Sequence, residues 1–241
     1  MAKTMLRLVR RYRAIPIAVL VVLAACTPPV PTVPPTADGV GFNRTTGGVD
    51  LLRAGGYKFR LDGSAPANLR NAVASDLDYA SSHLQWHTGL PFSRSTTPFN
   101  GGFMDVPPDG VITVSIVTAA EMAGVNGCGG ANVIGCGGVA KYSGGRVLSG
   151  RIAILDSHIA SASDYHLKTT ILHEAGHALN LAHKHDPYQG GLQTMHPTGG
   201  ANTGDYRHGD INGLKYMAAG SLNQAAAREG DSVHLVAVAT P

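Results

Sequence analysis

Three neighbouring residues, His173, Glu174 and His177, have the types and spacing best suited to chemistry in this chain. In a helix, side chains four residues apart point within about 40° of each other, because each residue turns the chain by about 100°. Both imidazoles can therefore reach one metal ion. Glu174 falls between the histidines and the apolar side of the helix, so it can contact water on that metal without becoming a ligand. The spacing predicts a metal site with a general base beside it.

A catalytic zinc site needs a third protein ligand and one open position for water. His183 can be that ligand if the chain turns sharply after the helix. The turn requires left-handed backbone, for which Gly is the usual residue and Asn, here Asn180, the next best. His185, two residues further on, is a competing ligand.

This segment resembles the metzincin signature, H-E-x-x-H-x-x-G-x-x-H followed by a Met-turn. The spacing in that family favours His183 over His185, and Asn180 stands where the signature has glycine. The resemblance implies a metzincin-like catalytic domain with one catalytic zinc ion, held by His173, His177 and His183.

Two further segments carry the resemblance towards the matrixin branch. Residues 193–197, QTMHP, look like the Met-turn, in which Met195 would form a polarisable floor beneath the metal. Residues 209–217, GDINGLKYM, are similar to the closing helix of matrixins. The resemblance spans about residues 57–217, although its specific motifs begin at His173.

The activity that the resemblance implies is zinc-dependent endopeptidase action on extracellular or envelope proteins. Glu174 would activate a zinc-bound water and pass its proton to the leaving amine. An extended protein or peptide substrate would pair with an exposed strand edge, for which the candidates are Gly138, Val139 and Ala140.

Two other functions remain open at this point. The chain could be a non-catalytic zinc-binding surface lipoprotein, although such a protein has no need for a general base at Glu174. It could also be a zinc-dependent hydrolase of a cell-wall amide bond. Matrixins often hold Ca²⁺ as well, and the following acidic residues could bind it or simply be solvated, since no calcium-loop spacing connects them: Asp156, Asp164, Asp186 and Asp205.

The first residues predict export. A basic stretch precedes a short apolar run, which is the layout of a signal peptide over residues 1–25, too short to span a bilayer. The run ends in Leu-Ala-Ala-Cys, which resembles the bacterial lipobox, so Cys26 is expected to carry a lipid anchor to the cell membrane or surface. The alternative is a secreted protein in which Cys26 is incidental. Residues 26–48 are rich in Pro and Thr and indicate a spacer.

The two remaining cysteines, Cys128 and Cys136, flank a Gly-rich stretch. In an exported protein a disulfide is the default interpretation of such a pair. Two ligands of a structural zinc ion, or two free thiols, are the alternatives.

The elements that must position the site form one α+β domain over residues 49–222, followed by a tail over 223–241. Strands are predicted at 57–61, 111–117 and 150–155 and an edge strand at 138–142, and helices at 66–87, at 163–180 and from about 210. Leu69, Val73, Leu77, Leu84 and Trp86 are expected in the core. This order favours a twisted, mostly parallel sheet with an antiparallel edge strand, an active-site helix and a C-terminal helix.

The charge of the chain is nearly balanced. A formal net charge of +3 over 241 residues offers no electrostatic footprint for nucleic acid. We therefore expect a monomer whose partners are its substrate and, through Cys26, a membrane.

Overall fold

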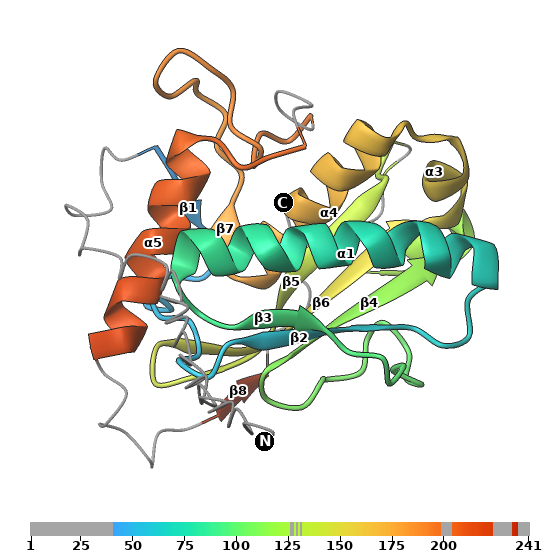
Figure 1. Ribbon diagram of the computed structural model, residues 1–241, viewed down its shortest axis with the longest axis horizontal. Coiled ribbons are helices and arrows are strands. Elements are labelled where there is room, and N and C mark those ends of the chain that lie inside the picture. Colours follow the sequence, from blue (N-terminus) through green and yellow to red (C-terminus); the bar gives the residue numbers. More distant parts are fainter. Residues whose placement is uncertain are drawn as a thin grey trace, which may run out of the picture.

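The computed structural model describes residues 41–125, 128, 130, 132–198, 204–223 and 233–235. A six-stranded sheet in the order β3-β2-β4-β6-β5-β8 forms its centre, and helices α1 and α4 contact each other on one face of that sheet (Figure 1). The fold is therefore α+β, with a mixed sheet of mostly parallel strands and an antiparallel edge, as the sequence predicts.

Four strands run parallel. They are β3 (Phe92–Arg94), β2 (Tyr57–Leu61), β4 (Val111–Val117) and β6 (Arg146–Leu155). The central strand β4 is almost entirely β-branched, which suits a strand covered on both faces, and most of its residues are buried. The bounds of β2 and β4 match the prediction, whereas β6 begins four residues earlier than the predicted strand.

The antiparallel edge consists of β5 (Gly135–Ser143) and β8 (Val233–Leu235). Strand β5 pairs with β6 along its length and with β8 at Lys141–Ser143. The predicted tail therefore contains one short strand that extends the sheet, while residues 135–140 of β5 have no strand on that side among the described residues.

Helix α1 (Ala67–Thr88) covers the sheet with a stripe that includes Val73, Leu77 and Leu84, all fully buried. It ends at Gly89, whose φ of 69° is the left-handed conformation that glycine adopts without steric cost. Helix α4 (Asp164–Ala178) lies within the predicted range 163–180 and is capped by Ser163, whose side chain accepts a hydrogen bond from the His166 backbone. Two short helices, α2 (Ala119–Ala123) and α3 (Asp156–Ser161), were not predicted, and α5 (His208–Asn223) closes the domain.

The segment before the predicted domain start also belongs to the folded unit. Strand β1 (Asn43–Arg44) pairs with β7 (Leu181–Ala182), and the Phe42 side chain lies in the core. The predicted boundary at residue 49 is therefore too late, because residues 41–48 pack against the turn that follows α4.

The predicted signal peptide, the lipidation candidate Cys26 and the first part of the spacer lie outside the described residues. Within the described part of the chain, no helix combines the length and the apolar character needed to cross a membrane.

Candidate functional site

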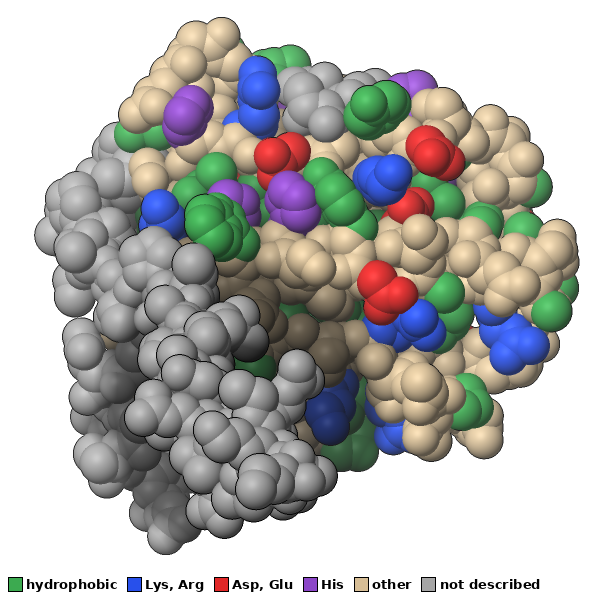
Figure 2. All heavy atoms as spheres, viewed as in Figure 1, with side chains coloured by type: hydrophobic (Ala, Val, Ile, Leu, Met, Phe, Trp, Pro, Cys, Tyr) green, Lys and Arg blue, Asp and Glu red, His purple; other side chains and the backbone are tan. Residues whose placement is uncertain are grey.

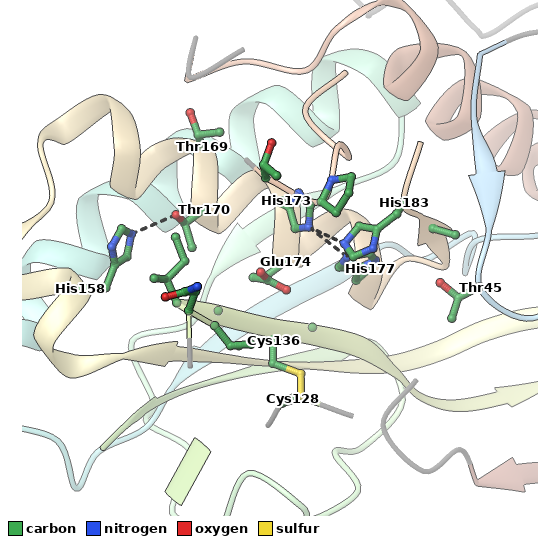
Figure 3. Close-up of a pocket in the computed structure, with 18 of the residues that line it drawn as sticks. Thr45, Cys128, Cys136, His158, Thr169, Thr170, His173, Glu174, His177 and His183 are labelled. Atoms are coloured by element: carbon green, nitrogen blue, oxygen red, sulfur yellow. Dashed lines mark hydrogen bonds between the residues drawn. A yellow bond between two sulfur atoms is a disulfide. The ribbon is translucent and has the colours of Figure 1, made fainter. Parts of the chain in front are cut away.

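The Nε2 atoms of His173, His177 and His183 lie close together. The Nε2 atom of His173 lies 3.0 Å from that of His177 and 3.2 Å from that of His183, and the last two are 3.2 Å apart. Figure 3 shows the three rings converging, with Glu174 between them and the strand that carries Cys136. Two ligands of one tetrahedral zinc ion lie about 3.3 Å apart, since each is about 2.0–2.1 Å from the ion. The triangle therefore has the size of a zinc-binding set.

The protonation of two of these rings follows from their hydrogen bonds. His173 Nδ1 lies 2.7 Å from the Thr194 carbonyl oxygen, and His177 Nδ1 lies 2.7 Å from that of Leu181. A carbonyl oxygen only accepts, so each Nδ1 carries the proton and each Nε2 presents a lone pair. Two lone pairs 3.0 Å apart repel each other unless a cation lies between them. The donor set therefore fits a metal ion, with its ligands oriented by backbone carbonyls.

Burial keeps these histidines in the neutral form that binds metal. It lowers the pKa of His173 to about 4, although the hydrogen bond to Thr194 opposes this shift. It also lowers the pKa of His177 well below its ordinary value and, less strongly, that of His183. At neutral pH all three rings can donate a lone pair.

A sharp turn brings His183 back to the helix. Asn180 has a φ of 79°, the left-handed conformation predicted for this position. After the turn, β7 pairs with β1, and the Asn43 side chain of β1 donates a hydrogen bond to the His183 carbonyl oxygen at 2.7 Å. His185, the competing ligand, is exposed, and its ring centroid lies 6.3 Å from that of His183. The structure thus places His183 in the metal-binding group and His185 outside it.

Glu174 occupies a buried position beside this group, with 5% of its surface exposed. Burial raises the pKa of its carboxyl to about 8, while a hydrogen bond from the Gly137 backbone opposes the rise. Glycine is needed on the facing strand, because a Cβ at Gly137 would collide with the Glu174 backbone carbonyl oxygen. The carboxyl group therefore titrates near neutral pH, as a general base requires.

The turn at residues 193–197 packs against α4, the helix that carries His173 and His177. Met195 is buried, and its Sδ atom packs so closely against Gly176 that a Cβ there would collide with it. The Asp210 carboxylate accepts hydrogen bonds from the backbone of Thr194, at 2.8 Å, and of Met195. Asp210, which the sequence analysis did not single out, therefore fixes the carbonyl that orients His173.

A cavity of about 730 Å³ opens in front of this group. Its strand wall consists of Ile134 and Gly135–Gly137, whereas the predicted substrate edge, Gly138, Val139 and Ala140, is buried and does not line the cavity. His158 and His166 line the far end, and the His158 ring contacts the Thr170 hydroxyl at 3.0 Å. The sequence analysis did not single out either histidine, because their spacing gives no signal for a place in the cavity.

Cys128 and Cys136 form a disulfide, as predicted, with their Cα atoms 5.7 Å apart. Both line the cavity, so the bond fixes the loop before β5 beside Glu174.

The four acidic residues considered for calcium do not come together. Asp156 lies in the first turn of α3, Asp164 pairs with Lys168, and Asp186 pairs with Lys184. Asp205 lies instead beside His83, 2.9 Å from its ring nitrogen.

Comparison with known proteins adds no identification to this geometry. No protein-family model matches the chain, and no curated protein matches it.

Proposed function

We propose that this chain is a zinc-dependent endopeptidase acting on extracellular or envelope proteins, with a metzincin-like, matrixin-like catalytic domain. The observation that carries the proposal is the triangle of Nε2 atoms next to a buried carboxyl group. His173, His177 and His183 would hold the ion. Zinc in such a set supplies Lewis acidity, which lowers the pKa of water towards about 7 and polarises a carbonyl group.

Glu174 supports hydrolysis rather than metal storage. A purely structural site gains nothing from a carboxyl group whose burial costs free energy and raises its pKa to about 8. As a general base, Glu174 takes a proton from the attacking water and gives it to the departing amine. Its hydrogen bond from Gly137 keeps the carboxyl group in one orientation while it does so.

The cavity wall formed by Ile134 and Gly135–Gly137 is where we place the substrate. An extended peptide can pair with a strand edge through its backbone, which gives affinity for many sequences. Glycines at positions 135 and 137 leave room for the Glu174 side chain and backbone at the same wall. The substrate edge thus shifts to the start of β5, before the predicted Gly138–Ala140.

The location of the enzyme follows from the predicted lipobox. A lipid on Cys26 would hold the catalytic domain at the cell membrane or surface, with the Pro-rich residues 27–40 between the lipid and the domain. Substrates would then be proteins that reach that surface.

Digestion of a denatured protein mixture tests the activity. The purified chain should cleave it, with new termini identified by mass spectrometry, and a zinc chelator should abolish cleavage until zinc is added back. Glu174→Ala should lower the rate by about 10²- to 10⁴-fold, the contribution of a positioned general base. Cleavage that persists after chelation, or in Glu174→Ala, would contradict the proposal.

A wild-type chain that binds zinc but cleaves no protein would also contradict it. Release of amines from cell-wall material by that same preparation would then favour the amide hydrolase. Each preparation should be checked by circular dichroism, so that lost activity is not mistaken for lost folding.

A further inference from the structure

A second group of metal-binding side chains lies outside the cavity. His83 and His87 are four residues apart on α1, so they share one face of the helix, and Asp205 faces them from the segment before α5. One ligand atom from each of the three residues lies within 4.8 Å of the other two. Figure 2 views the molecule from the side of α1 and shows histidine side chains next to an acidic one on this face.

The position of Asp205 is fixed by the backbone on both sides of it. The Gly204 carbonyl accepts from the Tyr79 hydroxyl at 2.8 Å, and the Gly204 N–H donates to the Thr169 hydroxyl at 3.0 Å. The buried Tyr206 hydroxyl donates to the Leu172 carbonyl at 2.7 Å. The carboxylate is therefore held beside α1 by contacts that do not involve the histidines.

An ion pair alone does not account for the group. His83 Nδ1 lies 2.9 Å from Asp205 Oδ1, which would satisfy these two residues if the imidazole were protonated. The Nε2 atom of His87, however, is buried and has no hydrogen-bond partner among the described residues. A buried, unpaired polar atom destabilises the fold, and a cation bound by all three side chains would give this nitrogen a partner.

We propose that His83, His87 and Asp205 form a second binding site, for a divalent transition-metal ion of the zinc class. Two imidazole nitrogens and one carboxylate oxygen are ligands that such ions prefer, whereas Ca²⁺ and Mg²⁺ take oxygen ligands. Zn²⁺ binds imidazole and carboxylate at about 2.0–2.2 Å, so its ligand atoms lie about 3.3–3.5 Å apart. The three ligand atoms already lie within 4.8 Å of one another, so small ring rotations complete the set.

The ion at this site joins α1 to the segment that supports the first metal site. The Asp205 carbonyl accepts from the Thr194 hydroxyl at 2.5 Å, and the Thr194 carbonyl orients His173. Metal bound by Asp205 therefore stabilises the turn at 193–197 through this hydrogen bond to Thr194. Its role is structural, and the site does not depend on whether the first one is catalytic.

Metal content measures the site directly. The full chain, equilibrated with Zn²⁺ and freed of loosely bound metal, should retain two ions by mass spectrometry, and Asp205→Asn should retain one. The paired variant His83→Gln and His87→Gln should also retain one. His208→Gln is the matched control, because it removes an exposed histidine at the start of α5 and should retain both ions.

A second measurement separates the two sites. In a chain carrying His183→Ala, which disrupts the first site, added Zn²⁺ should still raise the melting temperature, and Co²⁺ should give the absorption of a tetrahedral complex. Adding Asp205→Asn should abolish both effects. The Asp205 side chain is half-exposed, and asparagine has nearly the same shape as aspartate. Asp205→Asn should therefore fold even if the paired histidine variant does not.

The proposal is overturned if Asp205→Asn and the paired variant both retain as much metal as wild type. It is also overturned if His208→Gln loses the same amount, because binding would then be non-specific. Failure of protein cleavage does not bear on these results.

Discussion

Asn180 contacts Thr46 through both ends of its side-chain amide. Its Oδ1 accepts from the Thr46 N–H at 2.9 Å, and its Nδ2 donates to the Thr46 carbonyl at 3.0 Å and to the Val49 carbonyl at 2.7 Å. The residue that makes the left-handed turn before His183 therefore also fastens the N-terminal segment. Glycine could make the turn but not these three hydrogen bonds.

Asn180→Gly should therefore destabilise the domain although glycine suits the backbone conformation. Loss of the amide leaves buried backbone groups unpaired, and we expect the free energy of unfolding to fall by about 1–3 kcal/mol in a urea titration. Gln189→Gly is the control, because Gln189 is exposed and also has a positive φ, of 47°. Equal effects of the two substitutions would show that the amide contributes nothing.

The choice between the two competing third ligands gives a second prediction. Loss of a residue that only hydrogen-bonds to a metal ligand weakens metal binding by up to about 100-fold. His183→Ala removes a ligand itself, so it should weaken zinc binding by at least about 100-fold. His185→Ala should leave the affinity unchanged, because its exposed ring lies outside the group. Competition with a chromophoric chelator measures both. The reverse pattern would move the ligand to His185.

Much of the candidate metal site could be predicted because its geometry depends on local spacing. The i, i+4 histidines and the Asn at a left-handed position are properties of a single helix and its end, and both are found as expected. The parallel strands could also be predicted, since strands buried on both faces are continuous apolar runs.

The remaining features depend on contacts between distant segments. Asp210 and Asn43 contact the site from positions that have no spacing relation to the histidines. Trp86 was expected in the core from its residue type, yet it is 65% exposed because it lies on the side of α1 away from the apolar stripe. The predicted substrate edge lies outside the cavity wall, and β5 extends three residues further towards Cys128 than its pattern indicates.

Gly176 gives a third prediction, which concerns the floor of the site. Alanine favours a helix over glycine by about 1 kcal/mol, yet Gly176→Ala should lower the free energy of unfolding by about 1–3 kcal/mol, because the new methyl group would collide with Met195 Sδ. Gly47→Ala should be nearly neutral, since no atom lies within 4 Å of its Cβ position. Thermal unfolding of both proteins measures the difference, and a more stable Gly176→Ala would contradict the packing described here.

The buried Glu174 gives a prediction for pH. Its folded-state pKa of about 8 exceeds the ordinary 4.5, so the folded chain without zinc binds more protons than the unfolded chain between these values. The stability that the protonated carboxyl group contributes is present below pH 4.5 and is lost as pH rises towards 8. Relative to Glu174→Gln, the zinc-free wild type should lose up to about 1.4 kcal/mol per pH unit in this window.

Glu121 provides the matched control with the opposite sign. Hydrogen bonds from the backbone and hydroxyl of Thr118 lower the pKa of its carboxyl group. Its contribution is present above the ordinary pKa and is lost as pH falls, so Glu121→Gln should matter least in acid. A stability difference between wild type and Glu174→Gln that does not change with pH would contradict the burial of Glu174.

The central claim is that Glu174 acts as the base of a zinc peptidase. The most direct test is the kcat/KM for an internally quenched peptide, measured for wild type and Glu174→Gln in preparations whose zinc content is determined in the same samples. We predict equal zinc content and a loss of about 10²- to 10⁴-fold in kcat/KM. Peptide cleavage by zinc-loaded Glu174→Gln at the wild-type rate would contradict the account.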